Sequence, residues 1–250
     1  MRVQDRAALS HGLRPATEEI RQRGSMRADD ALRHCAVFGC GRPPQARAGK
    51  GVSLYYCRYH AQWHNRHGCH HKTTYSAADL APYRKATRRF VRANPHDPWI
   101  AHALFSLAEN LRNAGPVERM VDTYSMTPND KARAALARMR RREVPPETLL
   151  VNYLAVCCAI EMDPIRAGSE TANYRRVQAA KTCARTAATN NSDLPYRNRR
   201  YARSSGLLLV HLGRMIEEAC EHVQGYHLPA ILALAAAAPA SRGGRDTDTA

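Results

Sequence analysis

The sequence predicts a mainly α-helical protein with a small cysteine- and histidine-rich module near its N-terminus, followed by a multi-helix domain. Three observations support this fold class. Ala and Arg are abundant and β-branched residues are sparse among the 250 residues, which favours helices over sheets. Apolar residues return at helical spacing from about residue 77 onward. Four of the eight cysteines cluster with histidines before that point.

Changes in composition divide the chain into four expected segments. Residues 1–33 carry scattered charges and are expected to form a flexible arm, and residues 34–75 hold the Cys/His-rich module. Residues 76–240 are expected to form the helical domain, and the polar, Gly-containing residues 241–250 a disordered tail. A chain of this length accommodates one or two domains.

Capping residues and prolines mark the individual helices. Ser76 is expected to cap a helix over 76–94, and Thr127 with Pro128 begins a second helix over 127–143. Further helices are expected over 100–115, 145–164 (buried, ending before Pro164), 169–187 and 200–223. A short strand pair is expected around residues 52–56, inside the module.

The net charge of +16 at pH 7 makes a phosphate polymer the expected partner of this chain. We therefore expect nucleic-acid binding, with DNA favoured over RNA. A solvated basic surface without a partner is the alternative interpretation. No secretory apolar run is found near the N-terminus, and the apolar stretch 228–240 is too short to span a bilayer. These features predict a cytoplasmic protein without a membrane partner.

Three cysteines and one histidine follow the spacing C-x4-C-x16-C-x2-H, formed by Cys35, Cys40, Cys57 and His60. Two close pairs of thiolate and imidazole ligands suit a tetrahedral zinc ion. The Gly- and Pro-rich connector between the pairs rules out a continuous helix and lets the chain turn back. We expect structural zinc here; reduced cysteines without a metal explain the two-pair spacing less well.

The same stretch resembles the small zinc-binding modules of phage and mobile-element proteins, which are often attached to HNH homing endonucleases. The resemblance is carried by CAVFGCGRP at 35–43 and CRYHAQWHNRHG at 57–68, about forty residues in all. It implies the same four ligands and a basic helix after Cys57 that faces nucleic acid. The connector is longer than the family pattern, and GCHH follows at 68–71 in place of the usual continuation.

Basic residues continue from the module into the first long helix, where Asp79 is the only carboxylate between Asp30 and Asp97. We expect several of them to contact phosphates together. The candidates are Arg42, Arg47, Lys50, Arg58, Arg66, Lys72, Arg84, Lys85, Arg88 and Arg89. The aromatic residues of the module, Tyr55, Tyr56, Tyr59 and Trp63, are assigned mostly to packing, with base stacking as the alternative.

Two other groups of residues invite a chemical interpretation. A second metal site is conceivable at His64, His67, Cys69, His70 and His71. Partly exposed polar residues near phosphate, or a residue that exchanges with His60 as the fourth ligand, explain this group better. Buried, unreactive thiols are expected at Cys157, Cys158, Cys183 and Cys220, because no neighbouring base is recognisable.

The sequence favours a binding protein over an enzyme. The rest of the chain contains no His paired with a metal-binding Asp or His and followed, at the spacing of a ββα unit, by Asn and His. The sequence therefore gives no support for nucleic-acid cleavage. The alternatives are a divergent HNH-like nuclease and a protein-interaction scaffold. The role of the helical domain stays open, and homo-oligomerisation or a protein partner would suit it.

Overall fold

The computed structural model describes residues 34–44, 55–117, 125–188 and 206–237. The expected arm at 1–33 and tail at 241–250 lie outside these residues. The chain divides into two compact units, residues 1–72 and 73–250. The boundary falls three residues before the start of the long helix that the sequence predicts from Ser76.

The described part of the first unit contains one helix, α3 (Arg58–His67). The described part of the second unit contains α4 (Ala77–Ala93), α5 (Pro98–Arg112), α6 (Pro128–Arg141), α7 (Pro146–Met162), a short 3-10 helix (Gly168–Glu170), α8 (Thr171–Ala188) and α9 (Leu207–Ala236). No strand occurs among the described residues, so the mainly α fold class is confirmed. The residues of the expected strand pair that are described, Tyr55 and Tyr56, lie in a bend.

Side-chain caps set the starts of three helices. Two of them, α4 and α6, begin where the sequence places them, whereas α5 begins at Pro98 instead of the expected residue 100. Ser76 accepts a hydrogen bond from the Asp79 amide at 3.1 Å, and the Asp79 carboxylate accepts one from the Ser76 amide at 2.7 Å. Asp97 accepts from the amides of Trp99 and Ile100, both at 3.0 Å, at the start of α5. Thr127 caps α6 in the same way, with Pro128 in the first turn. The expected caps at Ser76 and Thr127 are therefore confirmed.

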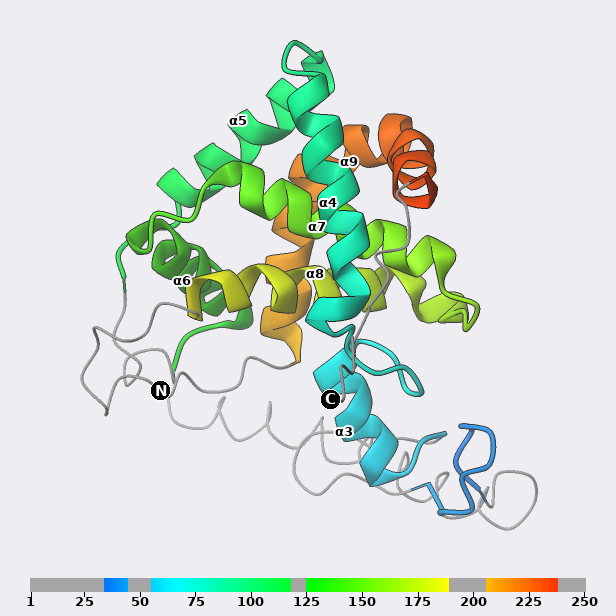
Figure 1. Cartoon of the computed structure of the whole chain (residues 1–250). Helices are drawn as coiled ribbons and strands as arrows, with labels where there is room; N and C mark the ends of the chain where they lie inside the picture. The colour runs from blue at the N-terminus through cyan, green and yellow to red at the C-terminus, as the bar shows by residue number, and fades with distance from the viewer. Residues whose placement is uncertain (1–33, 45–54, 118–124, 189–205, 238–250) are drawn as a thin grey trace, which may run out of the picture. The chain divides into compact units, whose positions relative to one another are not determined.

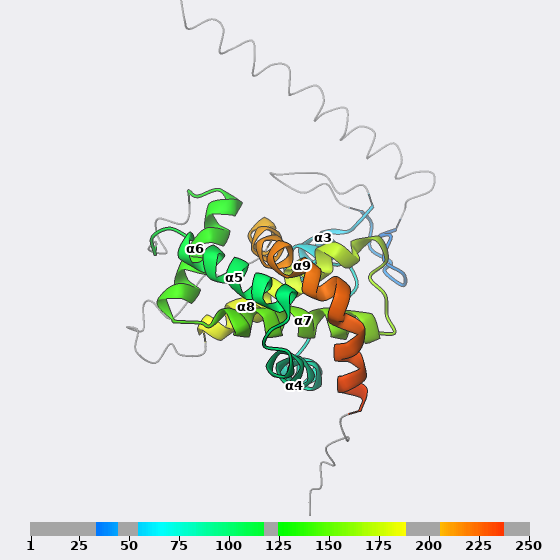
Figure 2. The same ribbon diagram turned by 90° about the horizontal axis from the view of Figure 1, so that it is seen from above.

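Helix α7 is the centre of the second unit. Twelve of its seventeen residues are buried, and it packs against α4, α5, α8 and α9. Figures 1 and 2 show these helices arranged around it. A helix that is apolar on every side is suited to the interior of a bundle. The expected buried helix before Pro164 is confirmed.

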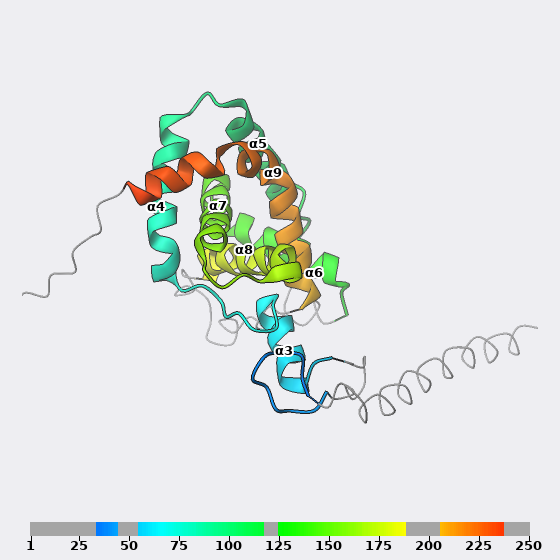
Figure 3. The ribbon, with the colours of Figure 1, turned by 90° about the vertical axis from the view of Figure 1, so that its right-hand side faces the viewer.

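The last helix differs from its expected bounds. Helix α9 begins at Leu207 and continues to Ala236, although Pro229 lies inside it. A proline lacks the amide donor and bends a helix, and Figure 3 shows the orange-to-red α9 changing direction along its length. The helix continues because Ile231 beyond the proline is fully buried in the core. None of the described helices combines the length and apolar composition that a membrane span requires.

Candidate functional site

The first half of the Cys/His cluster is a tight loop between Cys35 and Cys40. The amide of Cys35 donates to the carbonyl of Arg42 at 2.8 Å, and the amide of Cys40 donates to the carbonyl of Val37 at 3.0 Å. Gly39 has a φ of 73°, which lets the chain turn immediately before the second cysteine. These bonds turn both thiols of the loop toward one point.

The second half of the cluster is the start of α3. Cys57 is the N-cap residue and His60 lies in the first helical turn, so the two side chains project from the same side of the helix. The helix ends at Gly68, whose φ of 82° and amide bond to the carbonyl of His64 form a left-handed cap. The expected helix after Cys57 is therefore present.

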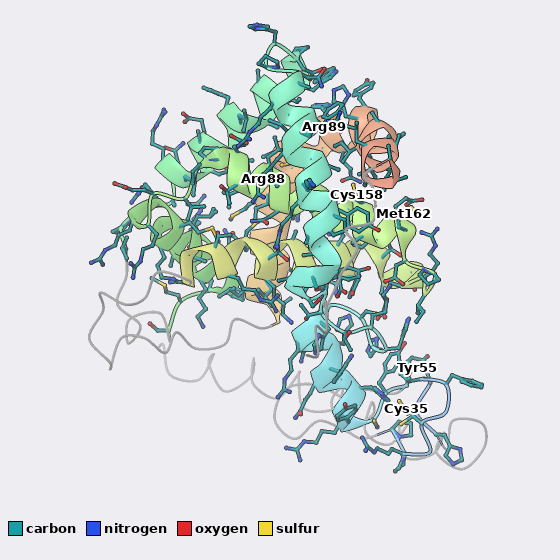
Figure 4. All side chains as sticks on the ribbon, in the orientation of Figure 1. Cys35, Tyr55, Arg88, Arg89, Cys158 and Met162 are labelled. Carbon is teal, nitrogen blue, oxygen red and sulfur yellow. The ribbon has the colours of Figure 1, made fainter. Side chains whose placement is uncertain are left out.

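The four expected ligand atoms lie together, all within 4.8 Å of one another. The Sγ atoms of Cys35 and Cys57 lie 3.2 and 3.5 Å from Nδ1 of His60, and Sγ of Cys40 lies 3.9 Å from Sγ of Cys57. Figure 4 shows Cys35 close to Tyr55, and the amide of Ala36 donates to the Tyr55 carbonyl at 2.8 Å. The cluster is close enough to hold a metal ion.

Burial and hydrogen bonding shift the pKa values inside the cluster. Burial raises the pKa of the Cys35 thiol. Burial opposes ionisation of Cys57 too, but hydrogen bonds, the first from the His60 amide, outweigh it and lower that pKa. Burial, helped by the charge of Arg42, lowers the pKa of His60. A lowered histidine pKa favours the neutral imidazole, the form that ligates metals.

The residues considered for a second metal form two pairs in the described part of the first unit. Sγ of Cys69 lies 3.4 Å from Nδ1 of His71. The rings of His64 and His70 stack at 4.3 Å, and the ring of His67 lies 4.3 Å from Trp63. Within this unit, the described residues bring three or more ligands together only at the Cys35 cluster.

The basic residues expected in the module differ in their accessibility. Arg42, Arg58 and Arg66 are exposed, and the Arg42 guanidinium lies over the Tyr59 ring at 4.9 Å. Lys72 is only 7 % exposed, so the structure does not present it to a partner as the sequence suggests. Arg47 and Lys50 lie outside the described residues.

Three of the four basic residues expected on α4 form one exposed row. Lys85, Arg88 and Arg89, joined by Arg92, line an open hollow of about 380 Å³, and Figure 4 shows Arg88 and Arg89 on this helix. None of these four side chains has an acidic partner among the described residues, and Asp79, the one carboxylate of α4, is engaged in its cap. Arg92 completes the spacing i, i+3, i+4, i+7, which is visible in the sequence.

Arg84, the fourth expected residue of α4, lies against the bundle instead. Its Nε donates to Oδ1 of Asn152 on α7 at 2.8 Å. Burial lowers the pKa of Arg84, and the charges of Arg88 and Arg185 add to this effect. The contact of a basic residue with a buried amide 68 positions away has no signal in the sequence.

The four cysteines outside the module are buried, as the sequence predicts. Burial raises the pKa values of Cys157, Cys158 and Cys183 to about 12 and that of Cys220 well above its usual value. At neutral pH these thiols are protonated and therefore unreactive.

The fold and the site together define a helical bundle that follows a small unit built around three cysteines and one histidine. The chain matches no family model, no curated protein and no solved structure.

Proposed function

We propose that this protein binds nucleic acid, DNA in preference to RNA, and that a zinc ion held by Cys35, Cys40, Cys57 and His60 gives its first unit a defined structure. The nucleic-acid part of this proposal is supported by the row of exposed cations on α4, which have no acidic partner among the described residues. The clustered ligand atoms carry the zinc part.

The donor set and its dimensions suit zinc. Zn–S bonds of about 2.3 Å and Zn–N bonds of about 2.0 Å in a tetrahedron place two sulfurs about 3.8 Å apart and a sulfur and nitrogen about 3.5 Å apart. The corresponding distances here are 3.9 Å for Cys40 to Cys57, 3.5 Å for Cys57 to His60 and a shorter 3.2 Å for Cys35 to His60. Three thiolates and one imidazole are also a donor set that prefers zinc over magnesium or calcium.

The charge distribution supports an anionic polymer as the partner. Residues 34–72 contain no carboxylate, and the row formed by Lys85, Arg88, Arg89 and Arg92 has no acidic partner among the described residues. Neighbouring cations repel one another, and the negative charges of a phosphate backbone relieve this repulsion. The counterions that the backbone releases on binding add to the affinity. A row about two helical turns long can contact several successive phosphates, which fix position without reading sequence.

The zinc part is tested by native mass spectrometry of the full chain. The wild type is expected to carry one zinc ion, and Cys57→Ser to carry none. Cys158→Ala is the matched control, because it removes a buried thiol of α7 outside the cluster. A wild type without zinc, or a Cys57→Ser variant that retains it, contradicts this assignment.

The nucleic-acid part is tested by measuring affinity for DNA and RNA against salt concentration. Each phosphate contact contributes about −0.9 to the slope of log K against log salt for duplex DNA. Replacing Arg88 and Arg89 by Gln is therefore expected to reduce the slope by about 2. The control, Arg133→Gln with Arg141→Gln, removes the same charge from exposed positions of α6. A flat salt dependence in the wild type contradicts the proposal and favours a protein scaffold.

A further inference from the structure

The loop between the first two cysteines presents a phenylalanine entirely to solvent. The side chain of Phe38 is 103 % exposed, at the turn between Cys35 and Cys40. It is one of only three phenylalanines in the chain. A side chain with no buried surface contributes nothing to the packing of its own unit, and its whole surface is accessible to a partner.

A second exposed ring comes from the segment that precedes α3. Tyr55 is 47 % exposed, and the 2.8 Å bond from the amide of Ala36 to its carbonyl ties its backbone to the Cys35 loop. Neither the Phe38 ring nor the Tyr55 ring stacks on another aromatic ring among the described residues. Tyr59 is equally exposed but already lies beneath the guanidinium of Arg42. Phe38 and Tyr55 are therefore the rings available to a ligand.

The chemistry around these rings favours nucleic-acid bases over other apolar ligands. All the large hydrophobic side chains exposed in the described part of the first unit are aromatic, whereas Met162, Ile165 and Leu207 are exposed in the second unit. A lipid bilayer or a protein groove accepts aliphatic side chains as readily as rings, but a base stacks on a flat ring. The exposed Arg42, Arg58 and Arg66 add charge that complements phosphate.

A single strand fits this surface better than a duplex. In a duplex the faces of the bases are covered by their neighbours, and only their edges are accessible in the grooves. In a single strand the faces can separate and stack on protein rings, while phosphates pair with nearby cations. Phe38 sits on a loop closed by two of the cluster ligands, so little conformational freedom is lost when a base binds.

We propose that the first unit binds single-stranded nucleic acid, with unpaired bases stacked on Phe38 and Tyr55 and phosphates on the neighbouring arginines. This inference rests on the proposed function and narrows its substrate class at the Cys/His unit. The row of cations on α4 contacts the backbone of either form.

The test compares full-length, zinc-loaded variants on a fluorescent oligothymidylate of about 12 nucleotides and on a duplex of the same length. Phe38→Ala is expected to weaken single-strand binding roughly 5- to 100-fold, with a much smaller effect on the duplex. Phe38→Leu is expected to behave like Phe38→Ala, because it keeps apolar character without a flat face. Phe38→Trp is expected to restore binding.

Phe105→Ala is the matched control, because this phenylalanine is 65 % exposed on α5, in the second unit. It is expected to leave single-strand affinity unchanged. The zinc content of each variant, measured in parallel, verifies that the first unit is intact. Tyr55→Ala is expected to weaken single-strand binding in the same direction as Phe38→Ala.

Several outcomes overturn the inference and are distinguishable from failure of the proposed function. If salt-dependent binding is present but Phe38→Ala matches Phe105→Ala, base stacking is wrong and the proposed function stands. If Phe38→Leu binds as tightly as wild type, the site is simply apolar. Loss of binding to phosphatidylserine vesicles in Phe38→Ala, with single-strand affinity unchanged, identifies a membrane surface instead. If neither nucleic acid binds in a salt-dependent manner, the proposed function itself fails.

Discussion

The two units of this protein differ in the residues that they bury. In the described part of the first unit, the buried hydrophobic residues are all cysteines, Cys35, Cys57 and Cys69, and α3 has no buried residue. In the second unit, α7 alone buries twelve residues, among them Leu149, Leu150, Tyr153 and Leu154. A unit with so little apolar interior needs another source of folding free energy, whereas the helical unit supplies its own.

The largest expected effect follows removal of the zinc ion proposed for the first unit. A zinc chelator is expected to abolish amide protection in α3, because structural zinc contributes an apparent binding free energy of about 10–16 kcal/mol. Hydrogen exchange of the full chain measures this, and peptides covering α7 serve as the internal control because their protection is expected to persist. Continued protection of α3 in metal-free protein contradicts a metal-dependent first unit.

The converse experiment removes apolar volume from the second unit. Leu154→Ala is expected to lower its free energy of unfolding by about 2–5 kcal/mol, because Leu154 is fully buried in α7 and its truncation leaves a cavity. Urea unfolding measures the loss, and zinc content is expected to be unchanged. Leu207→Ala, at an exposed position of α9, is the control. Equal effects of the two substitutions contradict the assignment of the core.

A smaller effect is expected where α9 packs closely against α8. A Cβ atom at Gly213 of α9 would lie 2.1 Å from the carbonyl oxygen of Arg176 in α8, so one helix must move to admit it. Gly213→Ala is expected to destabilise the protein by about 1–3 kcal/mol in thermal or urea unfolding. Gly225→Ala on the same helix meets no atom within 4 Å. It is expected to be neutral or stabilising by up to about 1 kcal/mol.

The smallest effect concerns the cap of α5 and its dependence on pH. Burial opposes ionisation of Asp97, but hydrogen bonds from the Ile100 and Trp99 amides and the nearby His227 lower its pKa. Asp97→Ala is expected to cost about 1 kcal/mol at neutral pH. The pKa of Asp97 is lower in the folded protein than in the unfolded chain. The stabilisation by its carboxylate is therefore complete at pH values above the unfolded pKa, and it disappears as the pH falls through the folded pKa. The free energies of unfolding of the wild type and of Asp97→Ala, measured from unfolding curves, are therefore expected to converge in acid. A difference between them that stays constant with pH contradicts this account.

The sequence predicts the structure correctly where a local interaction decides it. The caps at Ser76 and Thr127 act over three residues, and the loop between Cys35 and Cys40 turns over five. Composition alone places α7 in the interior, because a helix that is apolar on every side has no face for water. The C-x4-C-x16-C-x2-H spacing likewise predicted which four side chains come together.

The sequence predicts the structure less well where the outcome depends on distant residues. Pro229 normally ends a helix, but burial of Ile231 outweighs that preference and α9 continues. Arg84 and Arg88 look equivalent along the chain, yet only Arg84 is engaged by Asn152 of α7. Lys72 is basic and lies beside exposed residues, but the structure buries it.

The amino-acid sequence by itself determined the helical class, the starts of α4 and α6 and the identity of the four clustered side chains, because composition, short-range capping and residue spacing are all present in the chain before it folds. The tertiary structure decided which cations remain exposed, how far α9 extends and that Phe38 faces solvent. Exposure depends on whatever neighbours the folded chain supplies, and those neighbours are distant in sequence. The surface proposed to meet nucleic acid is therefore a property of the fold as much as of the composition.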